Sequence, residues 1–417
     1  MYALCDQRSF YASCEAVFRP DIRGQAIYIL SNNDGCVVAL NDQAKAAGVK
    51  KFEPYFKQRL LIQRAGVHAF SSNYALYGNI SDRIMQTLRA RTPSVEIYSI
   101  DEGFCDLSGI PTEDLKPLGR SLRQTVWNEQ RIPCGVSIAP TKTIAKLGQF
   151  ATKKIPKIDG VAVLTHPHQW EWLARRVPVA EVWGVGRRLS ATLTSMGVVS
   201  AHDLALLDKS LARKIGGLPL ARTIRELNGE PCIPMELNPP SKQQIICSRS
   251  FGTKLYQLED VLESVSAFAA RAAEKLRSQD SFAGRVSVWL MAGQHQRAGF
   301  SEANSVNLPG GSDDSRRIAR EAVAIAKRLY RPGGRYIKAG VELVDIRPRQ
   351  FWQMDLLNRE GETNKSPMPV VDQINRKYGR STVMLARQTG SAKFSMKQQK
   401  LSPLYLTRWQ DIPKLTC

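Results

Sequence analysis

The chain has 417 residues, which is too long for one hydrophobic core and predicts three or four domains. A hydrophobic fraction of 43% supports a fully globular protein, and no apolar run approaches the 18 residues that a membrane span needs. The formal charge of +21 favours nucleic acid as a partner over an anionic membrane surface. A solvated basic surface without any partner is the remaining alternative.

The cysteines and the chain start indicate the cellular compartment. The eight cysteines include no CxxC pair and no His spacing that would hold zinc, and most have apolar neighbours. The first residues show neither a basic n-region nor a long apolar h-region. We therefore expect a soluble, cytoplasmic protein with reduced thiols and no membrane partner.

The first 165 residues alternate between apolar runs and helical periodicity, which predicts an α+β domain. A turn-rich segment occupies 32–35, and Gly48 closes a short helix. We expect strands at 2–6, 26–31, 95–100, 104–107 and 135–138, and helices at 41–50, 81–91, 115–129 and 141–151.

Three carboxylates in this domain suggest a metal site. Asp6 ends the first strand, and Asp101 and Glu102 follow a later one. Adjacent residues on a flat strand point to opposite faces, so the pair can serve one site only at a turn, which Gly103 permits. Oxygen ligands on a basic chain predict Mg²⁺-assisted phosphoryl chemistry on a polyanion. A solvated turn is the alternative for Asp101 and Glu102 taken alone.

The character of the chain changes after residue 178. Residues 183–186 open a helix that carries Leu189 and Leu193 on one face and closes at 196–198. This is the composition of a helix-hairpin-helix, in which Gly184 and Gly186 let backbone N–H groups approach a DNA phosphate. An ordinary turn between two helices is the alternative.

The segment 238–241 is the clearest linker, and a compact domain follows it. Strands are expected at 245–251, 284–291, near 303–308 and at 337–346, with helices at 259–277 and 315–330. The resulting βαββαβ order is typical of a split-βαβ domain whose sheet is open on one face. Four basic residues are expected to track a phosphate backbone there: Arg249, Arg285, Arg335 and Lys338. From 347 onward the periodicity fades, which predicts a tail with short docking elements.

These motifs resemble those of a known enzyme family. The segments 6–15, 98–102 and 135–146 are similar to the Y-family translesion DNA polymerases, in order from residue 1 to about 345. The phrases 31–37, 70–74, 246–252 and 269–277 are most similar to the UmuC-type catalytic subunit of bacterial DNA polymerase V. The resemblance implies a right-hand α+β fold: palm (1–14 and 76–165), fingers (15–75), helical thumb with the helix-hairpin-helix (166–237), βαββαβ little finger (238–346) and C-terminal tail (347–417).

The resemblance also assigns the residues of the active site. It implies that Asp6, Asp101 and Glu102 are catalytic and hold two Mg²⁺ ions, with the backbone carbonyl of Gln7 as a further ligand. Tyr11 lies at the steric-gate position, where an aromatic ring excludes a 2′-hydroxyl; a core aromatic beside Phe10 is the alternative. The nucleotide-binding set that follows from the family comprises Phe10, Tyr11, Cys36, Ala39, Lys45 and Lys153.

Several of these assignments concern charge. Lys45 and Lys153 match positions that hold the incoming triphosphate, although either could be a solvated helix residue. Lys142 and Lys146 lie four apart on one helix face and are expected to contact primer–template DNA, or the triphosphate indirectly. Two departures from the family pattern stand out. Arg8 replaces an Asp or Asn, and Asp42 replaces a Tyr that contacts the triphosphate in several relatives.

The tail contains one sharp motif. Its residues resemble the pentapeptide by which bacterial polymerases dock on the sliding clamp. The alternative is an amphipathic turn that binds no partner. The motif consists of Gln353, Met354, Asp355, Leu356 and Leu357. The family also implies a cleaved UmuD-like dimer and RecA as partners, for which the tail is a plausible contact region.

Together these patterns predict a DNA-directed DNA polymerase for error-prone translesion synthesis in the SOS response to DNA damage. Its substrates would be primer–template DNA and dNTPs, and the active bacterial protein would be associated with the nucleoid. The first alternative is a catalytically impaired DNA-binding accessory subunit of the same fold, which only Arg8 favours. The second alternative is a palm-type enzyme with another substrate, such as a nucleotide cyclase.

Overall fold

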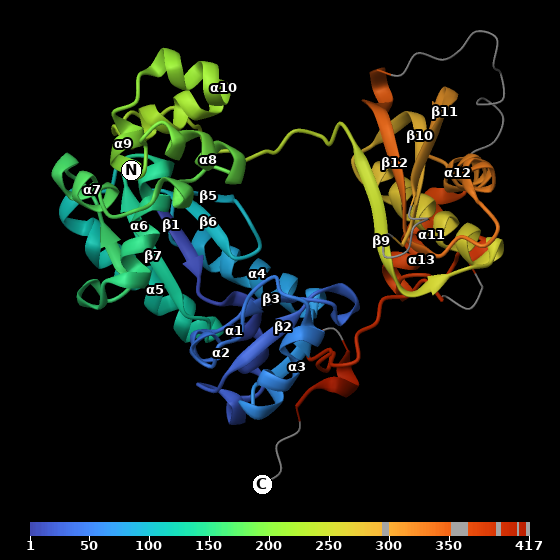
Figure 1. Ribbon diagram of the computed structural model, residues 1–417, viewed down its shortest axis with the longest axis horizontal. Coiled ribbons are helices and arrows are strands. Elements are labelled where there is room, and N and C mark those ends of the chain that lie inside the picture. The colour runs from blue at the N-terminus through green and yellow to red at the C-terminus, as the bar shows by residue number, and fades with distance from the viewer. Residues whose placement is uncertain (294–299, 352–365, 389–392, 407, 414–417) are drawn as a thin grey trace. The chain divides into compact units, whose positions relative to one another are not determined.

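The computed structural model describes residues 1–293, 300–351, 366–388, 393–406 and 408–413. The chain divides into two compact units (Figure 1). Unit 1 comprises Met1–Pro239 and Gln399–Cys417, and unit 2 comprises Pro240–Gln398. The division between them lies within the proline-containing segment 238–241, where few contacts are expected to cross.

A five-stranded sheet of order β5-β6-β1-β7-β8 forms the centre of unit 1. β1 lies in the middle because it is a nearly continuous apolar run, and it pairs antiparallel with both β6 and β7. The strands are β1 (Tyr2–Gln7), β5 (Ser94–Ile97), β6 (Glu102–Asp106), β7 (Cys134–Ala139) and β8 (Val161–Val163).

Helices cover both faces of this sheet. Alternate residues of β1 enter two different cores: Ala3 and Cys5 pack with α4 and α5, whereas Leu4 packs with α6. α6 lies close to β7 because Gly135 and Gly148 lack side chains; a Cβ at Gly148 would lie 2.8 Å from a Cβ of the sheet. These helices are α4 (Tyr74–Arg89), α5 (Leu115–Gln130) and α6 (Lys142–Lys154).

The predicted fingers contain a small sheet of order β3-β2-β4. Two of its strands and the helix α3 were not predicted, because each is short and lacks a clear period. The elements are α1 (Phe10–Val17), β2 (Ile27–Leu30), β3 (Val37–Leu40), α2 (Asp42–Ala46), α3 (Tyr55–Arg64) and β4 (His68–Ser71).

Residues 167–227 contain four α-helices joined by short connections. The longest helix of this region bends sharply at Gly217, whose φ of 69° is outside the helical region, and Pro219 lies two residues further on. The helices are α7 (Pro167–Ala174), α8 (Arg187–Ser195), α9 (Ala201–Ala205) and α10 (Lys209–Leu227).

Unit 2 has the predicted βαββαβ order. Its antiparallel sheet, β11-β10-β12-β9, is covered on one face by α11 and α12, whose apolar stripes pack on the strands. The elements are β9 (Ile245–Leu255), α11 (Leu258–Arg277), β10 (Ser281–Ala292), β11 (Ser301–Ser312), α12 (Ser315–Leu329) and β12 (Tyr336–Pro348).

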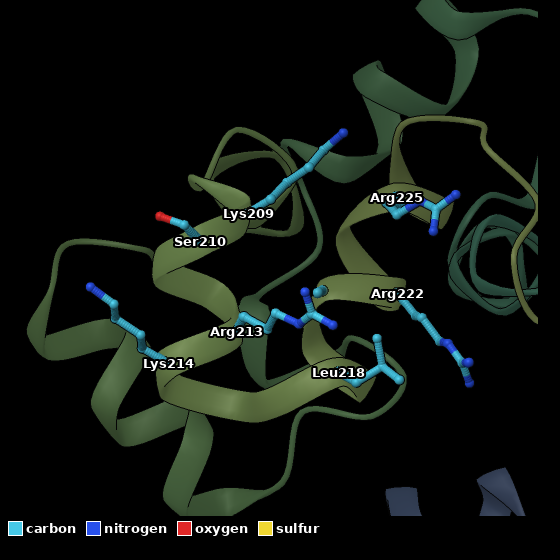
Figure 2. Close-up of a pocket in the computed structure, with 8 residues that line it drawn as sticks. Lys209, Ser210, Arg213, Lys214, Leu218, Arg222 and Arg225 are labelled. Atoms are coloured by element: carbon cyan, nitrogen blue, oxygen red, sulfur yellow. The ribbon is translucent and has the colours of Figure 1, made fainter.

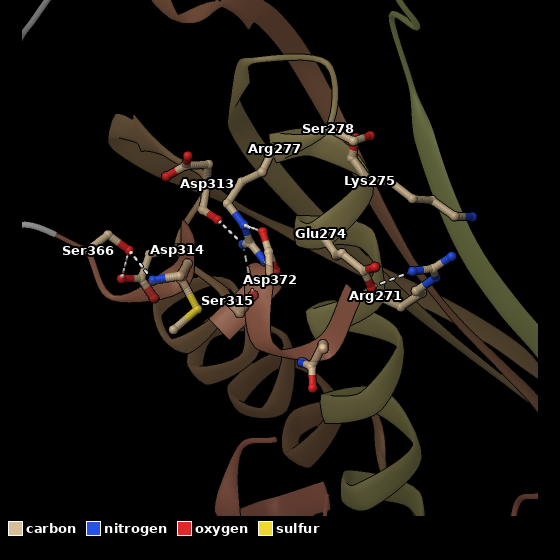
Figure 3. Close-up of polar contacts among 12 residues, drawn as sticks. Arg271, Glu274, Lys275, Arg277, Ser278, Asp313, Asp314, Ser315, Ser366 and Asp372 are labelled. Atoms are coloured by element: carbon tan, nitrogen blue, oxygen red, sulfur yellow. Dashed lines mark hydrogen bonds and ion pairs between the residues drawn. The ribbon is translucent and has the colours of Figure 1, made fainter. Parts of the chain in front are cut away.

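The C-terminal region contributes to both units. A further helix, α13 (Met368–Tyr378), belongs to unit 2. Figure 3 shows how it is held: the nearly buried Arg277 pairs with Asp372 at 2.6 Å and also donates to the carbonyl of Asp313 and the hydroxyl of Ser315. Residues 399 onward belong to unit 1.

Two negative observations apply to the described part of the chain. No helix within it is long and apolar enough to cross a bilayer. None of its seven cysteines forms a disulfide.

Candidate active site

Strand pairing brings the three predicted carboxylates to one edge of the central sheet. Asp6 of β1 lies directly opposite Glu102 of β6 in the antiparallel register. Directly opposed residues point to the same face with Cβ atoms about 5 Å apart. That face is the one covered by α6, because Leu4 and Phe104 of the same strands enter the α6 core. The two carboxylates therefore lie side by side beneath α6.

Asp101 lies in the turn that joins β5 to β6. The amides of Tyr98 and Ser99 both donate to the carbonyl of Glu102, which closes the turn. The Ser99 hydroxyl donates to the Asp101 carboxylate at 2.6 Å, and the amide of Gln7 donates to the Asp101 carbonyl at 2.9 Å. The turn precedes Glu102 instead of using the flexibility of Gly103, which lies within β6.

Two lysines from one face of α6 neutralise the carboxylates. Lys153 pairs with Asp6 at 2.8 Å, and Lys146 pairs with Glu102 at 2.7 Å. Burial raises the pKa of Glu102, and the charges of Asp6 and Asp101 add to that rise, while Lys146 opposes it. The three carboxylates are thus close enough to repel one another, and the two lysines offset part of this repulsion.

The chemistry of this donor set fits Mg²⁺. Carboxylate and carbonyl oxygens are its preferred protein ligands, and Asp6, Asp101, Glu102 and the Gln7 backbone supply only oxygen. Among the described residues, no three acidic, His or Cys side chains already form a metal cluster. The lysines hold two of the carboxylates instead.

Tyr11 lies on α1, next to this edge. Its half-buried ring stacks on Tyr77 of α4 with centroids 4.4 Å apart, and Tyr74 meets it edge-on at 6.1 Å. Its neighbour Phe10 is buried in the core. The charge of Asp101 contributes to the raised pKa of Tyr11, after burial and Tyr74, so the ring lies within electrostatic reach of the acidic turn.

The remaining nucleotide-binding candidates lie on the small sheet and its helix. Ala39 is on β3, and Cys36 is half-buried just before it. Lys45 is exposed in the last turn of α2, and Asp42 begins the same helix. Lys153, assigned to the triphosphate, contacts Asp6 in this structure.

The prediction that Lys142 contacts DNA is wrong. Its side chain is 1% exposed, and it pairs with Glu96 and donates to the carbonyl of Pro234 at 2.7 Å. It is a buried ion pair that connects α6 to the sheet and to the segment after α10. The i, i+4 spacing correctly indicated a shared helix face with Lys146, but the segment around Pro234 covers the Lys142 end of that face.

The side chain of Arg8 is bound to the end of α6. It donates to the carbonyl of Thr152, one residue before Lys153. The backbone of Arg8 is also held, by the carbonyl of Pro133 and the hydroxyl of Ser13. Arg8 therefore supports the end of α6 that carries Lys153.

The predicted helix-hairpin-helix glycines are exposed. Gly184 has a φ of 89°, which a side chain would disfavour, and Gly186 caps α8. The preceding Trp183 donates its indole N–H to Tyr98 at 2.8 Å, and Lys146 lies over the Tyr98 ring. No sequence pattern predicted this contact between the hairpin and the acidic turn.

A basic pocket on α10 was not predicted. It forms at the bend of this helix, and five basic side chains surround it (Figure 2). One of them, Arg225, is paired with Glu230. The lining basic residues are Lys209, Arg213, Lys214, Arg222 and Arg225. Their sequence spacing did not predict this pocket, because the bend brings basic residues from two arms of the helix together without a single helical period.

In unit 2 the predicted basic surface divides between two faces. Arg285 and Lys338 lie on the open face of the sheet, where Lys338 covers the ring of Trp289. Arg249 pairs with the buried Ala339, so it points to the helix-covered face and lines a groove with α11 and α13. The expectation that Arg249 joins the others is therefore wrong. The predicted clamp-binding residues 353–357 lie outside the described residues.

Models of two domains of one protein family match the chain. The impB/mucB/samB family matches residues 5–149, and the C-terminal domain of that family matches residues 242–356. A domain of unknown function, DUF4113, matches residues 368–415.

Known proteins are similar over the whole length. Protein UmuC of Salmonella typhimurium is 43% identical, with 99% of each chain covered, and MucB of Escherichia coli is 43% identical over all of both chains. A solved Y-family DNA polymerase chimera of Dbh and Dpo4 has the same fold, with a TM-score of 0.67 at 20% identity, over 83% of this chain and 99% of that one. The chain therefore belongs to the impB/mucB/samB family, and it is a UmuC-type member of the Y-family DNA-directed DNA polymerases.

Proposed function

We propose that this protein performs error-prone, template-directed synthesis across damaged DNA, as the catalytic subunit of a polymerase V-like complex in the SOS response. The observation that carries the proposal is the meeting of Asp6, Asp101 and Glu102 at one sheet edge beside Tyr11. The relatives UmuC and MucB support it over the full chain, and a solved insertion ternary complex of Dbh DNA polymerase shares the fold.

Each group at this edge has a role in nucleotidyl transfer. Asp6, Asp101, Glu102 and the Gln7 carbonyl would hold two Mg²⁺ ions, which assist attack by the primer 3′-hydroxyl and stabilise the leaving pyrophosphate. Lys153 pairs with Asp6 in this structure, so its ammonium group can exchange that carboxylate for a bound triphosphate as its ion-pair partner. Lys146 remains as a fixed positive charge next to Glu102.

Tyr11 is proposed as the gate for the sugar. Its ring is held by two neighbouring aromatic rings, and a rigid aromatic surface under the sugar leaves no room for a 2′-hydroxyl. Exposed Gly184 and Gly186, the α10 pocket and the open face of unit 2 would bind primer–template DNA through its backbone. Binding of this kind tolerates any template sequence.

Primer extension in Mg²⁺ tests the proposed reaction. Asp101→Ala should lower dNTP insertion by more than about two orders of magnitude, because it removes a metal ligand. The matched control is Asp106→Asn, at the other end of β6, whose carboxylate caps only Ser108. Equal extension by the native chain and the Asp101→Ala variant would refute the catalytic proposal and favour an accessory DNA-binding subunit.

The partners require a separate experiment. Extension past an abasic template site should depend on a cleaved UmuD-like dimer and RecA if the chain works in a polymerase V-like complex. The purified chain would be assayed with each partner alone and with both. Activity that neither partner changes would remove the polymerase V-like assembly from the proposal and leave the reaction itself intact.

A further inference from the structure

Residues 399–406 of the C-terminal segment are bound to the outer part of unit 1. The backbone amide of Lys400 donates to the hydroxyl of Ser71, and the amide of Ser71 donates back to the carbonyl of Lys400 at 2.9 Å. One residue earlier, the amide of Gln399 donates to the carboxylate of Asp34 at 2.9 Å. The segment is thus hydrogen-bonded to the end of β4 and to the turn before β3.

A buried asparagine connects this segment to α4. Asn73 is the N-cap of α4, and its side-chain oxygen accepts from the amide of Leu76. Its side-chain nitrogen donates to the hydroxyl of Ser402 at 2.9 Å. Asn73 and Ser402 are both buried, so neither can exchange its partner for water without cost. The start of α4 therefore depends on the C-terminal segment for one of its hydrogen bonds.

Aromatic packing fixes the segment to α1 as well. The ring of Tyr405 stacks on Phe18, which caps α1, with centroids 4.6 Å apart and planes 12° from parallel. Tyr405 is buried and belongs to the same apolar core as Phe10 and Tyr77. The segment is thus an integral part of the core that supports the first helix.

A buried carboxyl group lies between the segment and the gate. Glu15 of α1 is fully buried, and the hydroxyl of Tyr77 donates to it at 2.7 Å. Burial raises the pKa of Glu15 to about 7, and hydrogen bonding from Tyr77 and Ser402 opposes the rise. Tyr77 in turn stacks on Tyr11. The contacts therefore run from Ser402 to Asn73, whose carbonyl accepts from the amide of Tyr77 at 3.0 Å, and Tyr77, which also holds Glu15, stacks on Tyr11.

We propose that residues 399–406 are a positioning segment for Tyr11, acting through Asn73, Glu15 and Tyr77, so that sugar discrimination by the active site depends on the C-terminal end of the chain. The inference rests on the proposed role of Tyr11 as the sugar gate. Tyr77 is the direct support of the gate ring, and its hydroxyl is held in place by Glu15. When this support is lost, the Tyr11 ring gains room to move and admits a 2′-hydroxyl.

The test measures insertion of dCTP and rCTP opposite template dG by the full chain, with the partners it needs for activity. Three changes are compared: Tyr77→Phe, which keeps the stacked ring, Ser402→Ala, and a chain that ends at Gln398. The ratio of kcat/KM for rCTP over dCTP should rise about three- to tenfold, mainly through KM, as expected for the loss of one buried hydrogen bond. Trp409→Ala is the control, because that side chain is 87% exposed in the same region.

Two results would overturn the inference. One is an unchanged ratio in Tyr77→Phe and Ser402→Ala. The other is a lower melting temperature with an unchanged ratio, which shows a purely structural role. If the chain that ends at Gln398 does not fold, the rCTP/dCTP ratios of Tyr77→Phe and Ser402→Ala decide the test. Failure of the proposed function is distinct, because then the native chain and Trp409→Ala would not insert dCTP, or Tyr11→Ala would not increase rCTP insertion.

Discussion

At the scale of single residues, three lysines of α6 lie in two different environments. Lys146 and Lys153 of α6 face the acidic edge, whereas Lys142 of the same helix is closed off in a pair with Glu96. Sequence spacing placed Lys142 and Lys146 on one helix face correctly, whereas the helix extends past its predicted end at 151 to include Lys153. The spacing could not show which of them meets solvent, because that depends on the segment near Pro234 that covers Lys142.

Replacing Lys142 should therefore damage folding and not DNA binding itself. Removing one partner of a buried ion pair costs about 3–5 kcal/mol, so Lys142→Ala should lower the free energy of unfolding by that amount. Urea unfolding measures it. The double variant Lys142→Met, Glu96→Gln should recover much of the loss and bind primer–template DNA as the native chain does; weak binding by a stable double variant would restore Lys142 as a DNA contact.

Glu15 should give unit 1 a pH-dependent stability. Its pKa is about 7 when folded and 4.5 in the unfolded chain, so the folded state holds the proton more tightly. The stabilisation is complete below pH 4.5 and is lost as the pH rises through 7, by about 3 kcal/mol. Tyr77 and Cys14, which lie near Glu15, have raised pKa values and do not titrate in this range.

Urea unfolding of the full chain at pH 5 and pH 7.5 checks this effect. The native chain should lose more stability between the two pH values than Glu15→Gln does, because glutamine has no proton to lose. An identical loss in both chains would mean that Glu15 keeps an ordinary pKa in the folded protein.

At the scale of elements, α10 provides the clearest new surface. Its bend gathers Arg213 and Arg222 from two arms into one basic pocket (Figure 2). If these side chains contact phosphates, each single Ala variant should reduce the slope of log K against log salt by about one and weaken binding equally for all sequences. Fluorescence anisotropy with a primer–template duplex measures the slope. An unchanged slope in both variants would exclude the pocket from the DNA interface.

Long, regular elements were predictable from sequence, and short or irregular ones were not. The βαββαβ order of unit 2 follows from strong periodicity in α11 and α12 and from long strands. The strands β3 and β4 have four residues each and were missed, whereas the equally short β2 was predicted from its continuous apolar run. The face of Arg249 was misjudged although the strand is regular there: Arg249 alternates with the buried Ile245 and Cys247 of β9 and therefore shares their helix-covered face.

At the scale of the whole molecule, the carboxylate site was predictable because the family motifs fix its residues, while its lysine partners required the fold. The proposed clamp motif is tested at this scale too. Leu356→Ala with Leu357→Ala should abolish capture of the full chain by an immobilised sliding clamp, since two apolar anchors are lost. Extension on a primer–template without clamp should stay unchanged; retained capture would place the clamp contact elsewhere.

The path of the chain between the units has a consequence for its integrity. The chain crosses from unit 1 to unit 2 at Pro239 and returns at Gln399, where the bonds to Asp34 and Ser71 secure it. Unit 2 is therefore an insertion with both of its ends anchored. A protease that nicks one crossing leaves the two pieces joined by the other, so each remains at a high effective concentration for its counterpart. Release of unit 2 from unit 1 therefore requires a cut at each of the two crossings.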